Sequence, residues 1–179
     1  AVMDYLRLED ISSDYEFKLC RLDTAVKKAV KKFAPQFIGR HISLHIEQIE
    51  DSVCTDSKWL GFIIEQLISN AVKYSKDGGS VRIYTLHGSD GIKKNSKDDS
   101  LQLVIEDTGI GISEEDIPRI MERGFTGYNG RLDKKSSGIG LYLCRKAADR
   151  LGFVITYDAS YKNGTRVVID MTQRYTKHE

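Results

Sequence analysis

Two short glycine-containing turns hold the residues of this sequence that are best suited to chemistry. The first turn, "IEDTGIGI" at 105–112, places Asp107 where the largely apolar run "LQLVIE" ends. The second turn, "SSGIGLYL" at 136–143, again contains a glycine pair. Neither has the Gly-x-Gly-x-x-Gly spacing of a dinucleotide fold or the Gly-Lys-Ser/Thr ending of a P-loop. They therefore indicate another kind of ligand site.

The first turn suits a nucleotide base. Asp107 follows a predicted strand, where its carboxylate can accept a hydrogen bond from an amino group buried beside the sheet. The 6-amino group of adenine fits this description. Gly109 and Gly111 allow the backbone to turn tightly and to approach a flat ligand.

The second turn suits phosphate. Gly138 and Gly140 stand at the start of a predicted helix, whose unpaired N–H groups and positive dipole end favour anions. We expect the first turn to hold a base and the second to hold phosphates, with a lid between them.

A helix predicted over 56–74 completes the set. Its apolar residues recur at helical spacing, while Asn70, Lys73 and Tyr74 share the opposite, polar side with Gln66. An amide oxygen such as that of Asn70 suits Mg²⁺, which also bridges phosphates. Lys73 can neutralise a phosphate oxygen, and Tyr74 offers a ring beside a base or sugar.

The elements that must position these residues alternate without a regular βαβ order. The predicted helices are 3–11, 22–37, 56–74 and 138–152, and the predicted strands are 41–48, 80–88, 101–109, 153–159 and 164–172. We expect Asp23 or Thr24 to cap the second helix, near whose end stands Pro35. The pattern favours an α+β fold, a two-layer α/β sandwich with a mixed sheet and helices on one face.

Composition excludes several classes. With 27 Lys+Arg and 26 Asp+Glu, the net charge of +1 gives no reason to expect nucleic acid as a partner. The three cysteines lack disulfide or zinc-ligand spacing. No apolar run reaches the roughly 18 residues that a membrane span needs. The sequence predicts a cytoplasmic, soluble piece of a larger protein.

Together these residues resemble the ATP-binding domain shared by gyrase, Hsp90, histidine kinases and MutL, and within it bacterial sensor histidine kinases. The resemblance covers roughly Leu22 to Met171. Its N, G1, F and G2 boxes are similar to "SNAVKYS", "DTGIGI", "MERGFTG" and "SSGIGLYL", and a closing strand motif to "NGTRVVI".

The resemblance implies a Bergerat-type fold that binds Mg-ATP and transfers its γ-phosphoryl group to a histidine. Asn70 would be the metal ligand and, with Lys73, a catalytic residue. The implied cofactor-binding residues are Gln66, Asn70, Lys73, Tyr74, Asp107, Gly109, Gly111, Ile112, Arg123, Gly138, Ile139, Gly140, Leu141 and Thr165.

Two departures bear on mechanism. Ser136 stands where the G2 box usually begins with glycine, so the phosphate grip is expected to be looser. Gln66 stands where the gyrase-like branch has a glutamate that activates water, and an amide cannot take that proton. Glu65 is turned about 100° off the Asn70 face. These residues favour phosphoryl transfer to a protein over ATP hydrolysis.

The resemblance also implies partners. Residues 1–21, with "YLRLED", are expected to end a dimerisation helix and linker, and 22–179 to form the ATP-binding domain. None of His41, His45 or the other histidines suits the acceptor role, so we expect the acceptor on an upstream, homodimeric domain. A response regulator would receive the phosphoryl group. The whole protein is expected in the bacterial cell membrane, within the branch that senses cell-envelope antibiotics.

Two other functions remain open. An ATP-binding switch without catalysis would need the nucleotide only to order the lid; intact Asn70, Lys73 and Asp107 oppose it, and Ser136 weakly favours it. A serine kinase of the anti-sigma type has the same boxes, but residues 1–20 speak against it.

Overall fold

The computed structural model describes residues 15–88, 100–122, 124–125 and 139–172. The elements are β1 (Lys18–Arg21), α2 (Leu22–Gly39), β2 (Ser43–Ile46), β3 (Ser52–Thr55), α3 (Ser57–Tyr74), β4 (Ser80–His87), β5 (Leu101–Asp107), the 3₁₀ turn η1 (Ile117–Arg119), α5 (Gly140–Leu151), β6 (Val154–Tyr157) and β7 (Thr165–Asp170). The expected helix at 3–11 lies outside the described residues.

Five strands form one mixed sheet in the order β2-β4-β5-β7-β6. Only the β2–β4 pair is parallel; β4–β5, β5–β7 and β6–β7 are antiparallel. This order brings the end of β5 beside the start of β7, with Asp107 opposite Thr165. Two predicted site residues thus meet at one end of the central strands.

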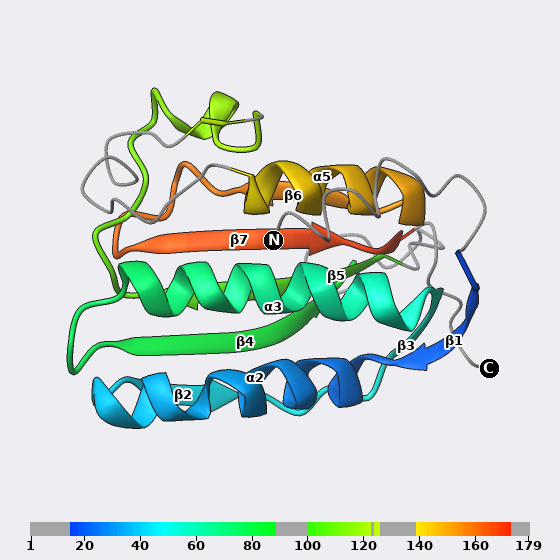
Figure 1. The fold of residues 1–179 in the computed structure, drawn as a ribbon, viewed down its shortest axis with the longest axis horizontal. Coiled ribbons are helices and arrows are strands. Elements are labelled where there is room, and N and C mark those ends of the chain that lie inside the picture. The colour runs from blue at the N-terminus through cyan, green and yellow to red at the C-terminus, as the bar shows by residue number, and fades with distance from the viewer. Residues whose placement is uncertain (1–14, 89–99, 123, 126–138, 173–179) are drawn as a thin grey trace.

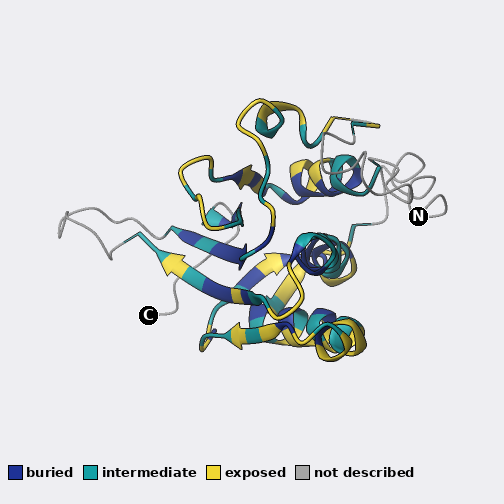
Figure 2. Ribbon diagram, turned by 90° about the vertical axis from the view of Figure 1, so that its left-hand side faces the viewer, coloured by how far each residue is buried: buried dark blue, intermediate teal, exposed yellow. Residues whose placement is uncertain are grey.

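Helices α2, α3 and α5 lie side by side over one face of this sheet, with α3 in the middle (Figure 1). Side chains at every second strand position point into this layer, as the alternation of buried and exposed residues requires. Figure 2 shows the buried residues concentrated between helices and strands. The predicted two-layer α+β sandwich with helices on one face is therefore confirmed.

A second, two-stranded sheet was not predicted. It joins β1 to β3 in antiparallel register, with Leu19 opposite Cys54. Each strand has only four residues, too few for an alternating pattern to stand out from the sequence. Of the cysteines, Cys144 is buried and none forms a disulfide, as expected.

The predicted cap of α2 is wrong. The helix begins at Leu22, and its N-cap residue Arg21 makes no side-chain cap hydrogen bond. Asp23 lies inside the first turn, where it accepts hydrogen bonds from Arg21 and from the backbone N–H of Thr24. Strand β1 runs directly into the helix, so the chain leaves no separate turn in which a polar residue could cap.

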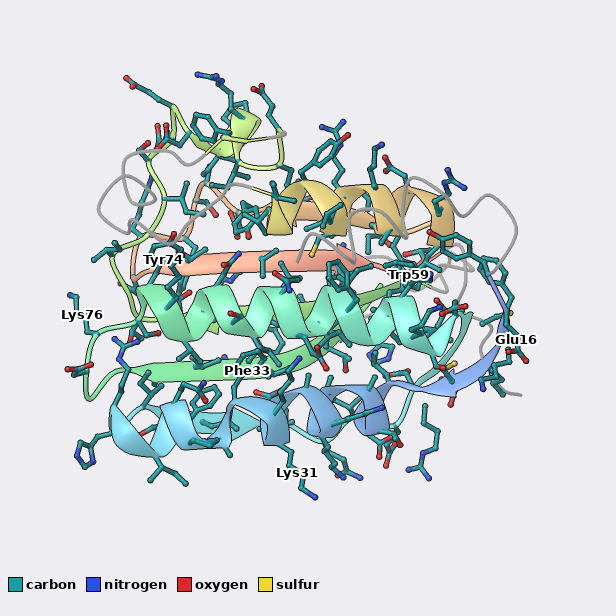
Figure 3. The ribbon with its side chains drawn as sticks, in the orientation of Figure 1. Glu16, Lys31, Phe33, Trp59, Tyr74 and Lys76 are labelled. Carbon is teal, nitrogen blue, oxygen red and sulfur yellow. The ribbon has the colours of Figure 1, made fainter. Side chains whose placement is uncertain are left out.

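Asp56 fixes the beginning of α3. One carboxylate oxygen accepts the backbone N–H of Trp59 at 3.0 Å, and the other accepts the N–H of Glu16 at 2.8 Å. Tyr15 stacks on Trp59 with ring centroids 5.9 Å apart. Figure 3 shows Glu16 and Trp59 together at this end of the helix, opposite Tyr74. Tyr15 and Glu16 are thus held at the N-terminal end of α3, far from the predicted site residues at its other end.

We expect Asp56→Ala to lower the free energy of unfolding by about 1–2 kcal/mol, because it removes a helix cap and a second hydrogen bond from a buried carboxylate. Urea unfolding measures the change. Ser57→Ala, at the exposed first position of the same helix, is the control. Equal midpoints for the two variants would contradict the capping role.

Arg40 fixes the other end of α3. Its guanidinium donates to the backbone oxygens of Val72 and Ser75 and, at 2.8 Å, to Asp77. The last carbonyls of a helix lack intrahelical partners, and a cation suits the negative end of the helix dipole. Arg40 follows the end of α2, so it ties two helices together beside the predicted site.

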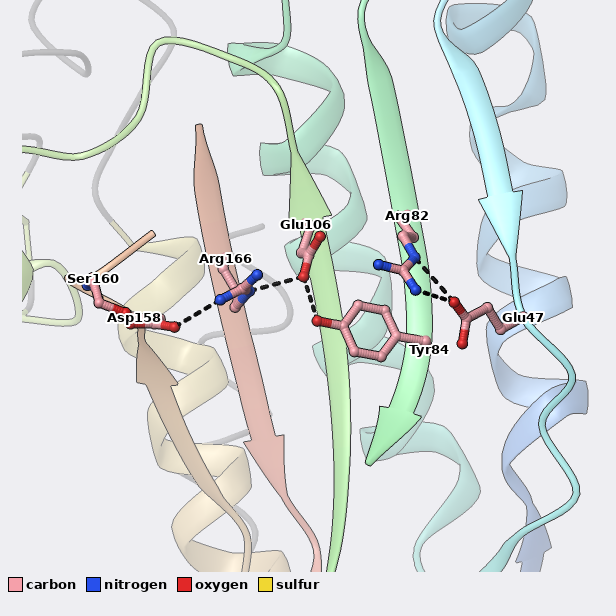
Figure 4. A network of polar contacts seen from close by, with 7 residues as sticks. All are labelled: Glu47, Arg82, Tyr84, Glu106, Asp158, Ser160 and Arg166. Atoms are coloured by element: carbon pink, nitrogen blue, oxygen red, sulfur yellow. Dashed lines mark hydrogen bonds and ion pairs between the residues drawn. The ribbon is translucent and has the colours of Figure 1, made fainter. Parts of the chain in front are cut away.

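The other face of the sheet carries polar contacts across β4, β5 and β7 and the residues that directly follow β2 and β6 (Figure 4). Buried Glu106 accepts hydrogen bonds from the Tyr84 hydroxyl and, at 2.8 Å, from Arg166, which also bonds Asp158 at 3.0 Å. Arg82 pairs with Glu47 at the sheet edge. Burial and Glu106 raise the pKa of Tyr84 to about 12, so this phenol remains a donor. This face is separate from the helix layer that holds the predicted site residues.

Candidate functional site

Asp107 is the buried carboxylate of the site. Only 4% of its surface is exposed. Burial raises the pKa of Asp107 to about 6. Hydrogen bonds from the backbone N–H groups of Gly109 and Thr165 lower this pKa, but their effect is smaller than that of burial. The Gly109 N–H donates to Oδ1 at 2.8 Å. A buried carboxylate that has lost its water is stabilised by each further hydrogen-bond donor, such as an amino group.

The turn after Asp107 packs tightly against the end of α3. The N–H of Ile110 donates to the backbone oxygen of Tyr74 at 3.2 Å. A Cβ added at Gly109 would lie 2.1 Å from that same oxygen and 2.8 Å from Oδ1 of Asp107. No residue other than glycine fits here without moving α3 away from the turn.

We expect Gly109→Ala to destabilise the chain by roughly 1–3 kcal/mol, because the added methyl overlaps backbone that cannot move independently. Gly61→Ala is the matched control. A Cβ at Gly61 in α3 would have no neighbour within 4 Å, so this change should stabilise by roughly 0.5–1 kcal/mol. Thermal unfolding decides, and similar shifts for both variants would refute the close packing.

A glycine outside the predicted set closes the turn from the other side. A Cβ at Gly164 would lie 1.9 Å from the backbone oxygen of Asp107, and the oxygen of Gly164 lies 3.0 Å from a Cβ built at Gly111. Gly111 has a φ of +74°, which favours glycine. Gly164 begins the strand predicted over 164–172, but only the pairing of β5 with β7 explains why it must be glycine.

The polar side of α3 lies toward the start of α5. Gln66 reaches α5, where its Oε1 would lie 2.7 Å from a Cβ at Gly140. The ammonium of Lys73 lies 5.2 Å from the centre of the Tyr74 ring. Glu65 is turned toward α2 and pairs with Lys32 at 3.0 Å, which agrees with its predicted absence from the site face.

Tyr157 is a site residue that the sequence reasoning missed. It ends β6, is buried beneath the helix layer, and lies near the side chains of Cys144, Asp107 and Asn70. Burial strongly raises its pKa, and the nearby charge of Asp107 raises it further. Alternation along β6 places Tyr157 inward like Ile155, but no local pattern indicates its closeness to Asn70.

A pocket of about 450 Å³ opens between segment 110–117 and the ends of β6 and β7. Gly111, Ile112 and Thr165 line it, together with Tyr157. Asp107 and the α3 residues do not line this pocket. Two of its lining residues lie next to them: the backbone N–H of Thr165 donates to Asp107, and Tyr157 lies near Asn70. Its volume falls within the range of small-molecule sites.

Some of the remaining predicted site residues lie at the start of α5, and others lie outside the described residues. Ile139 and Gly140 begin α5, and Leu141 is half-buried, whereas Leu143 takes the fully buried position. Arg123 and Gly138 lie outside the described residues, as do residues 126–137 of the expected lid.

The described part of the chain has no cluster of three or more His, Cys, Asp or Glu side chains that would hold a metal ion. Within the same residues, no helix is both long and apolar enough to cross a bilayer.

Comparison with known proteins gives one family. Residues 55–174 match the model of the family described as "Histidine kinase-, DNA gyrase B-, and HSP90-like ATPase". The chain is 35% identical to "Sensor protein BceS" of Bacillus subtilis over 89% of its length, and 40% identical to "Sensor protein kinase GraS" of Staphylococcus aureus over 67%. It spans 45% and 32% of these relatives, respectively.

Solved structures give the same fold. "Mycobacterial sensor histidine kinase MprB" superposes with a TM-score of 0.70 at 22% identity, covering 90% of this chain and 100% of that one. "ShkA full-length in complex with AMPPNP" superposes with a TM-score of 0.76 at 16% identity, covering 99% and 35%. Identities this low support the fold alone.

Proposed function

Because the chain belongs to the family of histidine kinase-, DNA gyrase B- and HSP90-like ATPases, as the ATP-binding catalytic domain of a sensor histidine kinase, we propose that it transfers the γ-phosphoryl group of Mg-ATP to a histidine elsewhere in the whole protein. The observation that carries this proposal is the buried carboxylate of Asp107 between close-packed glycines, beside the polar side of α3.

The base binds at Asp107. The adenine amino group supplies an additional donor to this desolvated carboxylate. Guanine carries an oxygen at the corresponding position, which would repel the carboxylate. Asp107 therefore selects ATP over GTP.

The donor set around Asn70 fits a magnesium ion that is held mainly by phosphate and water. Asn70 offers one neutral amide oxygen, and the described residues add no acidic cluster. Mg²⁺ commonly keeps several waters and bridges phosphate oxygens. When bound, it neutralises charge on the transferring phosphoryl group. Lys73 adds a positive charge from the next turn of α3.

Phosphoryl transfer is favoured over hydrolysis by the side chains on α3. Gln66 occupies the site face and cannot accept a proton from water at neutral pH. Glu65 lies on another side of the helix, where it forms an ion pair with Lys32. Water therefore lacks a base on this helix, and the attacking group comes from a protein.

The acceptor histidine lies on another segment of the whole protein. His41 and His45 are exposed at the β2 edge of the sheet, and His87 pairs with Asp51 at 2.8 Å. All three lie on or beside strands rather than on a helix. An upstream dimerisation domain supplies the histidine, with residues 1–21 as the connection and 22–179 as the ATP-binding domain.

A response regulator receives the phosphoryl group in this proposal, and the whole protein resides in the bacterial membrane. Similarity to the sensors BceS and GraS supports these partners and the branch that senses cell-envelope antibiotics.

The test is to mix the 179-residue chain and labelled ATP with a purified upstream segment that contains the histidine. Acid-labile phosphate should appear on that segment, and almost none on the chain alone. Comparable labelling of the chain alone on its own histidines would refute the proposal. ATP binding without any transfer would favour the non-catalytic switch instead.

A further inference from the structure

We infer that Arg166 is a positioning residue for base recognition: its guanidinium holds the first residues of β7 in place, so that the turn at Asp107 keeps the shape that accepts adenine. The inference rests on the proposed role of Asp107. It assigns a function to a charged side chain on the face of the sheet opposite the helices, which phosphoryl transfer itself does not use.

The start of β7 extends past the end of its neighbour β6. The β6–β7 ladder reaches only as far as Val167, so Thr165 and Arg166 lie beyond its last pair. On their other side, these two residues pair with Asp107 and Glu106 of β5. The position of this extension therefore depends on contacts other than the β6–β7 ladder.

The side chain of Arg166 supplies such contacts (Figure 4). Its guanidinium donates to the buried carboxylate of Glu106 at 2.8 Å and to Asp158 at 3.0 Å, and its carbon lies 4.3 Å from the centre of the Tyr161 ring. The backbone oxygen of Arg166 accepts the N–H of Asp158 at 2.9 Å. Hydrogen bonds between charged partners are stronger than neutral ones. One residue thus ties β7 both to β5 and to the loop between β6 and β7.

The turn at Asp107 is sensitive to the position of β7. A Cβ added at Gly164 would lie 1.9 Å from the backbone oxygen of Asp107 and 2.8 Å from the nitrogen of Gly109. That same nitrogen donates to the Asp107 carboxylate at 2.8 Å. A displacement of Gly164 would therefore disturb the backbone that orients this carboxylate, because a close-packed interior transmits strain. Preorganisation of this kind improves binding without a new contact to the ligand.

The test compares the double variant Glu106→Gln/Arg166→Met with Glu106→Gln alone. The amide keeps an oxygen for the Tyr84 hydroxyl, so loss of the guanidinium leaves no unpaired carboxylate on β5. Calorimetric titration of the 179-residue chain with ATP and with GTP is the measurement. Relative to Glu106→Gln, we expect the affinity for ATP to fall about three- to tenfold and the preference for ATP over GTP to shrink by a similar factor.

Arg82→Met is the matched control. It also removes an ion-paired arginine from this face of the sheet, but on β4, where the guanidinium pairs with Glu47 and lies 4.5 Å from the centre of the Tyr84 ring. The control should keep the preference for ATP over GTP. Thermal unfolding of all variants measures the structural cost of each change, which by itself does not alter a preference between two nucleotides. An equal loss of preference in Arg82→Met would overturn the inference.

Combination with Asp107→Asn separates positioning from direct contact. If Arg166 acts through Asp107, adding Glu106→Gln/Arg166→Met to Asp107→Asn should not reduce the preference for ATP further. An additive loss, or a loss of affinity that is equal for ATP and GTP, would overturn the inference. If Asp107→Asn itself leaves the preference unchanged, the base site of the proposed function falls, and the positioning role falls with it. If the preference shrinks in Asp107→Asn but not in Glu106→Gln/Arg166→Met, the proposed function stands and only the role of Arg166 is lost.

Discussion

Phosphorylation of the upstream histidine should fall by at least about 100-fold when Asn70 is replaced by alanine. The loss follows because a metal that bridges phosphates contributes several kcal/mol of charge stabilisation, and about 2.7 kcal/mol corresponds to a factor of 100. Asn70 is half-buried on the polar side of α3, so the chain should still fold when it is replaced. Binding of Mg-ATP should weaken far more than metal-free binding.

Calorimetry with and without Mg²⁺, together with labelling of the upstream segment, measures this effect. Glu65→Gln is the control, since it alters a carboxylate on the same helix that faces α2 and pairs with Lys32. That variant should transfer phosphate at the normal rate. Equal losses of metal-bound and metal-free affinity in Asn70→Ala would remove the metal-ligand role.

Replacement of Asp107 by asparagine should reduce ATP affinity at least about tenfold. One carboxylate oxygen becomes a donor, so the hydrogen bond from the adenine amino group turns into a donor–donor contact; a bond to a charged group contributes about 1.5–3 kcal/mol. The same donor suits the guanine oxygen, and the preference for ATP over GTP should shrink.

Glu106→Gln is the matched control for this change. Glu106 is the neighbouring buried carboxylate on β5, but it points to the other face of the sheet, where it bonds Tyr84 and Arg166. The control should keep the preference for ATP. An unchanged preference in Asp107→Asn would place the base elsewhere.

The pKa of Asp107 adds a pH dependence with a defined sign. Its pKa is about 6 in the folded chain against an ordinary 3.8, so folding favours the protonated form. Its contribution to stability is complete below about pH 4 and is lost as the pH rises through 6. Without nucleotide, wild type should lose about 2–3 kcal/mol relative to Asp107→Asn between pH 4 and pH 7.

Nucleotide binding should show the opposite trend. The ionised carboxylate accepts the adenine amino group, so the affinity of wild type relative to Asp107→Asn should rise with pH through 6. Protonation of the nucleotide itself affects both proteins equally and cancels in this comparison. Parallel pH profiles for the two proteins, in stability or in affinity, would contradict a raised pKa.

Helix α3, which carries several predicted site residues, could be predicted from the sequence because helix formation depends on residues a few positions apart. The apolar and polar residues of α3 recur at helical spacing, and the observed helix begins at Ser57, next to its cap Asp56. Alternation predicted β4, β5 and the β6–β7 hairpin for the same reason. The predicted cap of α2 was wrong because β1 joins the helix without an intervening turn.

The sequence by itself determined the types of residue, their order along the chain and the two glycine turns, since each depends on neighbours a few positions away. The tertiary structure alone decided which distant residues meet. Gly164 approaches Asp107, and Thr165 lies opposite Asp107, because β7 pairs with β5. Side chains joined in this way leave no periodic signal, because strand order and helix packing, rather than local spacing, set the distance between them.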